Sequence, residues 1–327
     1  MGAILNVINR EGNTEKFEGH ANISLISSKL LMEGPLPKFK GLKGSWMIAG
    51  RRTYFDTFFN AICGDACDEA GFKFPYFFYD YQLKVNIDVN QDHRLTYSRF
   101  YGDDVLDFSF KPTVDEYYDI NSDYYEKSTN TFGIDWPWGN HTNSLTWRWL
   151  ISPQLVARTF FATSRYRFHF DMNSKYEGTW SAGNESGDYL DQWSFDFYDY
   201  VDDQTLETEI SWHGIENHQI MGGLQLKKVD YDLGMEFEYK NLDTTYYAKP
   251  LEMKQQTIET SLFLQDKWKL SPKIDLQIGG RIMKYSLHDE MYIDPRFGLK
   301  YLLQQDLSLK FSVGRFHQFL TIANPED

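Results

Sequence analysis

Two cysteines are the residues of this sequence best suited to covalent or metal chemistry. Cys63 and Cys67 are separated by three residues in a segment of small and acidic side chains. Two thiolates do not complete a structural zinc site, which needs four ligands. The spacing therefore favours a small loop disulfide, with free thiols as the alternative and a metal site as the least favoured interpretation.

The histidines and serines form no catalytic pattern. His213 and His218 flank an expected tight turn, and His288 lies at an expected hairpin tip, where solvated turn residues are the simpler interpretation. The serines nearest to a histidine, Ser286 and Ser312, do not occupy a Gly-x-Ser-x-Gly elbow, and the sequence has no Gly-rich phosphate loop. The sequence predicts no enzyme and no cofactor or metal site.

Aromatic side chains are better candidates for binding, because they make up 17% of the chain and gather at 117–125 and at 136–141. Such rings either stack on a sugar or a siderophore catechol or form the belt that Trp and Tyr make at a membrane interface. Trp147 and Trp149, on the strand that follows, share these alternatives. The candidate ligand-binding residues are Tyr117, Tyr118, Tyr124, Tyr125, Trp136, Trp138 and His141.

The negative charge of the protein is concentrated in two stretches. The chain of 327 residues has a formal net charge of −14, and residues 103–125 and 171–203 carry −6 and −8 of it. This balance excludes the clustered basic face that a nucleic-acid binder needs. The stretches either attract cationic solutes or divalent ions that bridge lipopolysaccharide, or are simply solvated loops.

Alternation of apolar and polar residues, the signal of β-strands, runs through most of the chain. No apolar run is long enough for a membrane-spanning helix, and a mean hydropathy of −0.53 is compatible with a β-barrel, whose strands are only half apolar. We expect twelve strands, many of them longer than is usual in soluble domains. Their ranges are 17–34, 44–58, 75–89, 93–108, 130–151, 154–171, 192–214, 219–239, 254–270, 273–288, 292–304 and 306–318.

The connections between these strands are expected to alternate in length. Tight turns such as 90–92 and 152–153 follow the odd strands, and longer loops at 59–74, 109–129, 172–191 and 240–253 follow the even ones. Outer-membrane barrels have short periplasmic turns and long extracellular loops. The pattern therefore predicts an all-β, antiparallel transmembrane barrel portion, with the strand arginines Arg51, Arg52, Arg148, Arg165 and Arg167 facing the lumen.

Two regions resemble TonB-dependent outer-membrane receptors. The segment from Gly2 to Gly19, with its Arg10-Glu11-Gly12-Asn13 link, is similar to the exit of the family's plug domain, and the stretch from Leu31 to Asp56 is similar to the first barrel hairpin. The segments Phe263-Leu264-Gln265-Asp266-Lys267-Trp268, Pro295-Arg296-Phe297-Gly298-Leu299 and Gly314-Arg315-Phe316-His317-Gln318 resemble the middle of the family's barrel. The resemblance implies that residues 1–16 end a plug domain and that 17–327 form the N-terminal part of an incomplete barrel.

The resemblance also implies a function and a location. Family members take up a scarce nutrient such as a ferric siderophore, cobalamin or a glycan across the Gram-negative outer membrane. The implied partners are outer-membrane lipid and lipopolysaccharide, the small-molecule or glycan substrate, and the TonB–ExbB–ExbD complex, which would act through an N-terminal part absent from this sequence. The sequence also begins without a signal peptide. The alternatives are a passive porin and a surface-exposed, carbohydrate-binding β-sheet protein.

Overall fold

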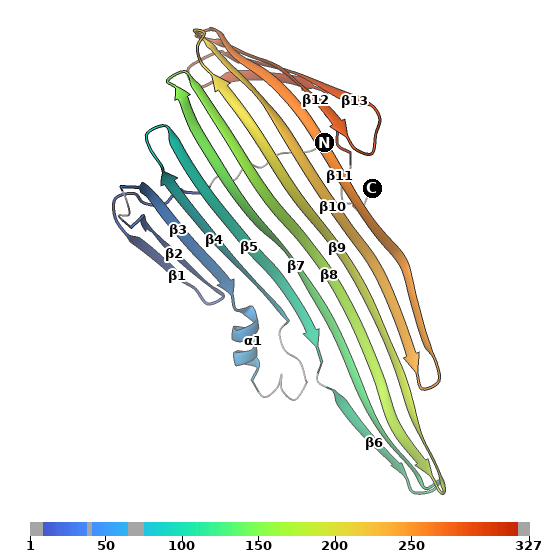
Figure 1. Cartoon of the computed structure of the whole chain (residues 1–327). Helices are drawn as coiled ribbons and strands as arrows, with labels where there is room; N and C mark the ends of the chain where they lie inside the picture. The colour runs from blue at the N-terminus through green and yellow to red at the C-terminus, as the bar shows by residue number, and fades with distance from the viewer. Residues whose placement is uncertain (1–8, 38–40, 65–74, 111, 320–327) are drawn as a thin grey trace.

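The computed structural model describes residues 9–37, 41–64, 75–110 and 112–319 as one curved, antiparallel β-sheet with a single short helix (Figure 1). Thirteen strands follow one another in chain order, and β6 adds only to β7. No pairing joins β1 to β14 among the described residues, so the sheet remains open. The fold class predicted from the alternation, a long-stranded but incomplete barrel wall, is confirmed.

The elements have the following bounds. The first part of the sheet consists of β1 (Glu18–Ile23), β2 (Ser27–Pro35), β3 (Lys43–Thr53), α1 (Phe55–Cys63), β4 (Tyr76–Asp88), β5 (His93–Ser109) and β6 (Thr113–Asp119). The second part consists of β7 (Tyr124–Ser152), β8 (Leu155–Ala182), β9 (Glu185–Trp212), β10 (His218–Asn241), β11 (Thr245–Ser271), β12 (Ile274–Tyr285), β13 (Met291–Leu302) and β14 (Ser308–Gly314).

The sheet has fourteen strands where the sequence predicted twelve. The expected strand 17–34 is divided into β1 and β2 by a turn in which the amide of Ser24 donates to the carbonyl oxygen of Ser27. The second additional strand, β6, lies within the expected loop 109–129. The expected strand 44–58 ends early, at Thr53, because α1 begins at Phe55 and runs into the expected loop 59–74. The nine residues of α1 are too few to cross a membrane, and no described helix is long and apolar enough to do so.

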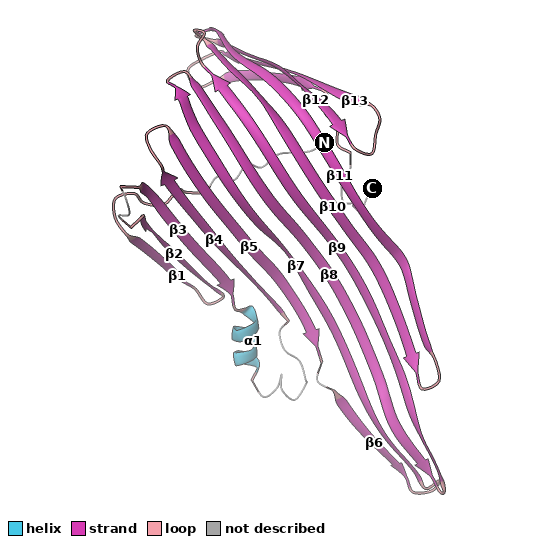
Figure 2. Cartoon of the chain, viewed as in Figure 1, coloured by secondary structure: helices cyan, strands magenta, loops and turns pink. Residues whose placement is uncertain are grey.

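The prediction of long loops is wrong at 172–191 and 240–253, and mostly wrong at 109–129. Strands β7, β8 and β9 have 29, 28 and 28 residues, and a two-residue turn at Gly183–Asn184 joins β8 to β9 (Figure 2). At about 3.3 Å per residue, such a strand reaches about 90 Å. The acidic stretches therefore belong largely to strands, in which acids alternate with aromatic residues.

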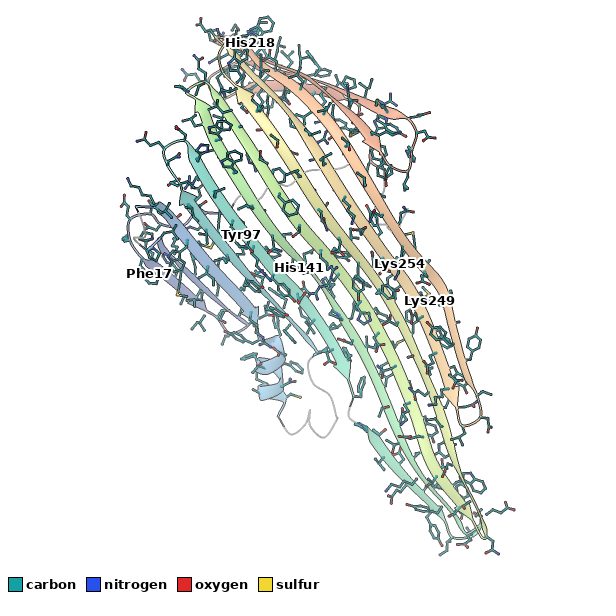
Figure 3. All side chains as sticks on the ribbon, in the orientation of Figure 1. Phe17, Tyr97, His141, His218, Lys249 and Lys254 are labelled. Atoms are coloured by element: carbon teal, nitrogen blue, oxygen red, sulfur yellow. The ribbon has the colours of Figure 1, made fainter. Side chains whose placement is uncertain are left out.

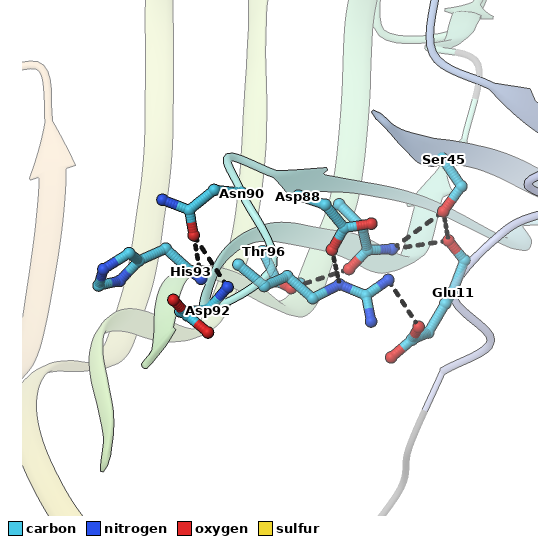
Figure 4. Close-up of polar contacts among 9 residues, drawn as sticks. Glu11, Ser45, Asp88, Asn90, Asp92, His93 and Thr96 are labelled. Carbon is cyan, nitrogen blue, oxygen red and sulfur yellow. Dashed lines mark hydrogen bonds and ion pairs between the residues drawn. The ribbon is translucent and has the colours of Figure 1, made fainter. Parts of the chain in front are cut away.

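One face of the sheet is identified by the N-terminal segment that lies on it. The carbonyl oxygen of Glu11 accepts hydrogen bonds from Ser45 Oγ at 2.6 Å and Asn86 Nδ2 at 2.7 Å (Figure 4). We call this face inner and the opposite face outer. Because side chains alternate along a strand, the continuous registers then assign every position of β4 to β10 to one of the two faces.

This assignment corrects the prediction for three arginines. Arg51 and Arg148 project from the inner face, as expected. Arg52, Arg165 and Arg167 project from the outer face, because they share the phase of the outer apolar residues. Arg165 binds Asp202 there through two hydrogen bonds of 2.5 and 2.6 Å.

The polarity of the two faces reverses along the strands. Nearest the short turns, the outer face carries exposed apolar side chains, which we call the apolar band, and the inner face carries polar ones. Representative band residues are Leu145, Phe161, Leu206, Leu224, Leu226, Leu262, Leu264, Ile278 and Ile282. Their inner-face neighbours include Thr142, Ser144, Glu207, Gln225 and Ser261.

Beyond the cross-strand row of Asn140, Tyr166, Val201, Tyr231 and Gln255, most aromatic side chains lie on the inner face, and most charged ones, including all the basic ones described, lie on the outer face. We call this part of β5 to β11, which includes β6, the extension. The reversal takes place within continuous strands, without a change of secondary structure.

Candidate ligand-binding surface

The structure distributes the predicted binding residues over both faces of the extension and its base. Trp136, Trp138 and Tyr124 of β7 and Tyr117 of β6 project from the inner face. The other three, Tyr118, Tyr125 and His141, project from the outer face; Figure 3 labels His141 part-way along the long strands. The inner four lie on one face but in two separate clusters, one around Trp136 and Trp138 and one around Tyr117 and Tyr124.

The inner residues nearest the apolar band form a cluster of rings, which we call the aromatic platform. Trp136 meets Phe168 and Phe170 edge to face, with centroids 5.9 and 5.4 Å apart. The ring of Phe168 in turn contacts the edge of Phe197, with ring centroids 5.8 Å apart, and Trp138 stacks on Tyr76, with centroids 6.3 Å apart. Pairs of this kind contribute about 0.5–1.5 kcal/mol each beyond area burial. The platform consists of Tyr76, Trp136, Trp138, Phe168, Phe170, Phe195 and Phe197.

Two carboxylates border the platform. Asp104, the cross-strand neighbour of Trp138, accepts a 2.7 Å hydrogen bond from Tyr76 Oη. Burial and this carboxylate together raise the pKa of Tyr76 to about 12. Asp199 lies opposite Phe168 in the register, and partial burial raises the pKa of its carboxyl group. Neither carboxylate has a basic partner among the ion pairs of the described residues.

A second inner cluster lies at the far end of the extension, around Glu126. Tyr189 and Tyr124 donate hydrogen bonds of 2.6 and 2.9 Å to its carboxylate, and Tyr176 donates one of 3.5 Å. The ring of Tyr117 lies 6.2 Å from that of Tyr124. The hydrogen bond from Tyr189, followed by that from Tyr124, lowers the pKa of Glu126. The carboxylate therefore stays ionised among four tyrosines.

On the outer face, His141 lies beside a polar network of Tyr101, Asp103 and Arg167. Its ring stacks on Tyr101 at 6.0 Å, and Tyr101 Oη donates to Asp103 at 2.6 Å. Asp103 also accepts from Arg167 at 2.5 Å. The carboxylate fits over Gly139, where an added Cβ would lie 2.0 Å from Asp103 Oδ1. The stacking on Tyr101 gives the His141 ring a structural place in the sheet.

Trp147 and Trp149 lie in the apolar band instead. They project from the outer face, 38% and 37% exposed, and stack on each other at 5.8 Å. This placement fits the interface-belt interpretation for these two residues. Trp136 and Trp138 have the opposite orientation, so the belt interpretation does not apply to them.

Sequence reasoning missed most of the platform. Phe168 and Phe170 were assigned only to the expected strand 154–171, Phe195 and Phe197 lay in an acidic stretch interpreted mainly by its charge, and Tyr76 is 60 residues from Trp136 in the chain. The usable signal was the strict alternation of Phe168 and Phe170 with His169 and Asp171. That alternation places the two rings on one face of a strand.

Comparison with protein-family models assigns the chain to a family. Residues 78–321 match the family model described as TonB dependent receptor-like, beta-barrel. The chain belongs to this family. No curated protein matches the chain closely enough to add to this assignment.

Among solved structures, this TonB dependent receptor-like β-barrel has matches of low similarity. The Pseudomonas putida toluene transporter TodX is 8% identical, with 91% of this chain and 78% of that chain covered and a TM-score of 0.34. The Ralstonia pickettii toluene transporter TbuX is 9% identical, with coverages of 88% and 75% and a TM-score of 0.33. The Pseudomonas aeruginosa ferripyoverdine receptor is 8% identical, with coverages of 93% and 62% and a TM-score of 0.21.

In this β-barrel family member, residues 9–12 are fastened to the inner face of β2 to β5. Arg10 pairs at 2.9 Å with Glu33, whose side chain is 1% exposed. Lys84 Nζ donates to the carbonyl oxygen of Asn9 at 3.0 Å, and Arg94 pairs with the Glu11 carboxylate at 3.1 Å. Gly12, at φ +88°, lets the segment approach β3 closely. We call these four residues the docked segment.

Two further groups bear on metal and redox chemistry. The side chains of Glu18, His20 and Glu33 place one ligand atom each within 4.8 Å of one another. Lys16 already pairs with Glu18, and Arg10 pairs with Glu33, so both carboxylates have a basic partner. Cys63 ends α1, whereas Cys67 lies outside the described residues, so their pairing remains a prediction.

Proposed function

We propose that this chain forms the plug exit and the first part of the barrel wall of an outer-membrane receptor that takes up a scarce nutrient with energy supplied through TonB. Residues 1–16 would end the plug, and 17–327 would belong to the barrel. The nutrient classes proposed are a ferric siderophore, cobalamin or a glycan. Outer-membrane lipid and lipopolysaccharide would surround the apolar band.

The observation that carries this proposal is the aromatic platform on the inner face, just beyond the apolar band. A solute that enters from outside the cell meets this surface before it reaches the polar inner wall. Half-buried rings such as Trp136 and Phe168 provide flat apolar area on which sugar or aromatic rings stack. The inner face of the wall is thus arranged to bind the nutrient at the extracellular end of the strands.

The docked segment supports the receptor interpretation over a simple pore. It brings the chain that precedes the first strand against the lumen wall, where a plug would lie. Ion pairs and hydrogen bonds hold it there. In such a receptor, force applied to the plug would be resisted at this point of the wall.

The test is uptake in cells that carry or lack a functional TonB protein. We expect cells that express the full-length protein to gain growth on one limiting nutrient from the three classes, only when TonB is functional. Trp136→Ala should lower that uptake, and Trp147→Ala, which removes an outer-face ring, should not. Nutrient flux that is equal with and without TonB would refute the receptor proposal and favour a passive pore.

A further inference from the structure

The inner face of the extension lacks the basic side chains that its outer face carries among its carboxylates. Among the described residues of β5 to β11 beyond the row of Asn140 and Tyr166, the inner positions hold seven carboxylates and no lysine or arginine. The seven are Asp104, Asp115, Asp119, Glu126, Glu185, Asp191 and Asp199.

The basic side chains of the same region all lie on the outer face. Arg167 pairs there with Asp103, and Lys249 pairs with Glu236. Lys254 lies opposite Asp232 (Figure 3). The outer basic residues are Lys127, Arg167, Lys175, Lys240, Lys249 and Lys254. Several outer carboxylates thus have a lysine or arginine partner, whereas none of the seven inner ones has such a partner among the described residues.

The aromatic rings lie on this same acidic face. Asp199 is flanked across the sheet by Phe168 and on its own strand by Phe197, and Asp104 lies opposite Trp138. At the far end, four tyrosines surround Glu126. A ring face attracts a cation, and a nearby carboxylate adds to the attraction. An anion would meet only like charge on this surface.

We propose that the inner face of the extension captures an organic cation that carries a ring, with the platform stacking on the ring and Asp104 and Asp199 facing the charge. This inference rests on the proposed function and narrows its substrate class. The partial burial of Asp199, which raises its pKa in the empty protein, is consistent with a site where a cation supplies the missing partner. The cluster around Glu126 would make the first contact.

The experiment measures binding of four small probes to the full-length protein in lipid nanodiscs by saturation-transfer NMR. Benzyltrimethylammonium has both a ring and a positive charge, and phenylmethanesulfonate has a ring and a negative charge. Benzyl alcohol has the ring alone, and tetramethylammonium has the charge alone. We expect benzyltrimethylammonium to bind at least about tenfold more tightly than the other three, and this preference to shrink as salt screens the charges.

Matched variants locate the site. Asp199→Asn keeps the shape of the side chain and should lower the affinity for benzyltrimethylammonium about threefold to tenfold, and addition of Asp104→Asn should remove the preference over benzyl alcohol. The control Asp188→Asn removes an exposed acid from the outer face of the same strand and should change nothing. Retained binding of benzyl alcohol shows that the platform is still folded in each variant.

Three results would overturn the proposal. Equal binding of the cation and the sulfonate would indicate a merely apolar surface. No binding of any probe would indicate that other segments of the protein cover the platform. Cation binding that is unchanged in the double variant would place the site elsewhere. Because binding needs no energy source, failure of TonB-dependent uptake with intact cation binding would refute only the proposed function.

Discussion

Replacement of Gly12 by alanine should release the docked segment from the wall. Gly12 has φ +88°, and a Cβ at this position would lie 2.6 Å from the carbonyl oxygen of Trp46. The left-handed backbone costs an L-residue about 1–2 kcal/mol. Backbone atoms of a strand cannot rotate away, so the segment must lift and lose the two hydrogen bonds to the Glu11 carbonyl oxygen, each of which contributes about 1 kcal/mol.

The sum, about 3–4 kcal/mol, corresponds to at least a hundredfold change in the population of the released segment. Trypsin cleavage after Arg10 measures this population, because a protease needs an extended, undocked chain and its rate follows the open fraction. We therefore expect Gly12→Ala to accelerate cleavage after Arg10 by about a hundredfold in the full-length protein in nanodiscs.

Gly41 offers a matched control. It has a similar φ of +78°, but an added Cβ would have no atom within 4 Å. Gly41→Ala therefore carries the backbone cost without the collision, and it should leave cleavage after Arg10 unchanged. Equal cleavage rates in Gly12→Ala and the unmodified protein would refute the docking argument, as would equal acceleration by both substitutions.

Four further predictions concern other parts of the sheet. Gly139→Ala should destabilise the protein by about 1–3 kcal/mol in denaturant titration, because the new Cβ collides with the carbonyl oxygen of Gly102 and displaces the Asp103 carboxylate from Arg167; the part of the cost due to Asp103 should disappear in an Asp103→Ala background, and an unchanged cost would contradict that part of the cause. Trp136→Ala should cost about 1–3 kcal/mol in the same titration, since it removes edge-to-face contacts to Phe168 and Phe170, and no loss of stability would show that the platform does not hold the strands together. Because the fold favours the ionised form of Glu126, this carboxylate stabilises the end of the β8–β9 hairpin at pH values above its ordinary pKa of 4.5, and this stabilisation is lost as pH falls through the lowered pKa of the folded state. Tyr189→Phe should raise the midpoint of a tryptophan-fluorescence pH titration, and Tyr118→Phe, on the outer face, should not change it. Finally, maleimide should label Cys63 and Cys67 only after reduction, and labelling without reductant would refute the disulfide.

Sequence reasoning was sufficient for the sheet because period-two alternation is a direct consequence of strand geometry. It located the tight turns predicted at 90–92 and 152–153 to within one residue of those observed at 89–92 and 153–154, since these turns join strands whose pairing is local. It failed at 172–191 because a run of acids was interpreted as a solvated loop, although Tyr176 and Tyr189 occupy one face of a hairpin. Register with distant strands decides that face, and a single sequence does not contain the register.

The candidate site was only partly predictable for the same reason. Trp136 and Trp138 attract notice as a pair, but the rings that complete the platform come from β4, β8 and β9. His141 is five residues from Trp136 and therefore lies on the opposite face, since an odd separation along a strand reverses the side. Proximity in the sequence grouped residues that the sheet separates.

The polarity reversal limits how this protein can change in length. From Phe161 to Tyr176, β8 runs without a bulge, while its apolar side chains move from odd positions to even ones. Removal of a single residue between the apolar band and the platform would rotate every ring beyond it to the outside and every outer charge to the inside. Residues within these strands must therefore be inserted or deleted two at a time, and in neighbouring strands together. The distance from the membrane surface to the aromatic platform can then change only in steps of two residues, about 7 Å each.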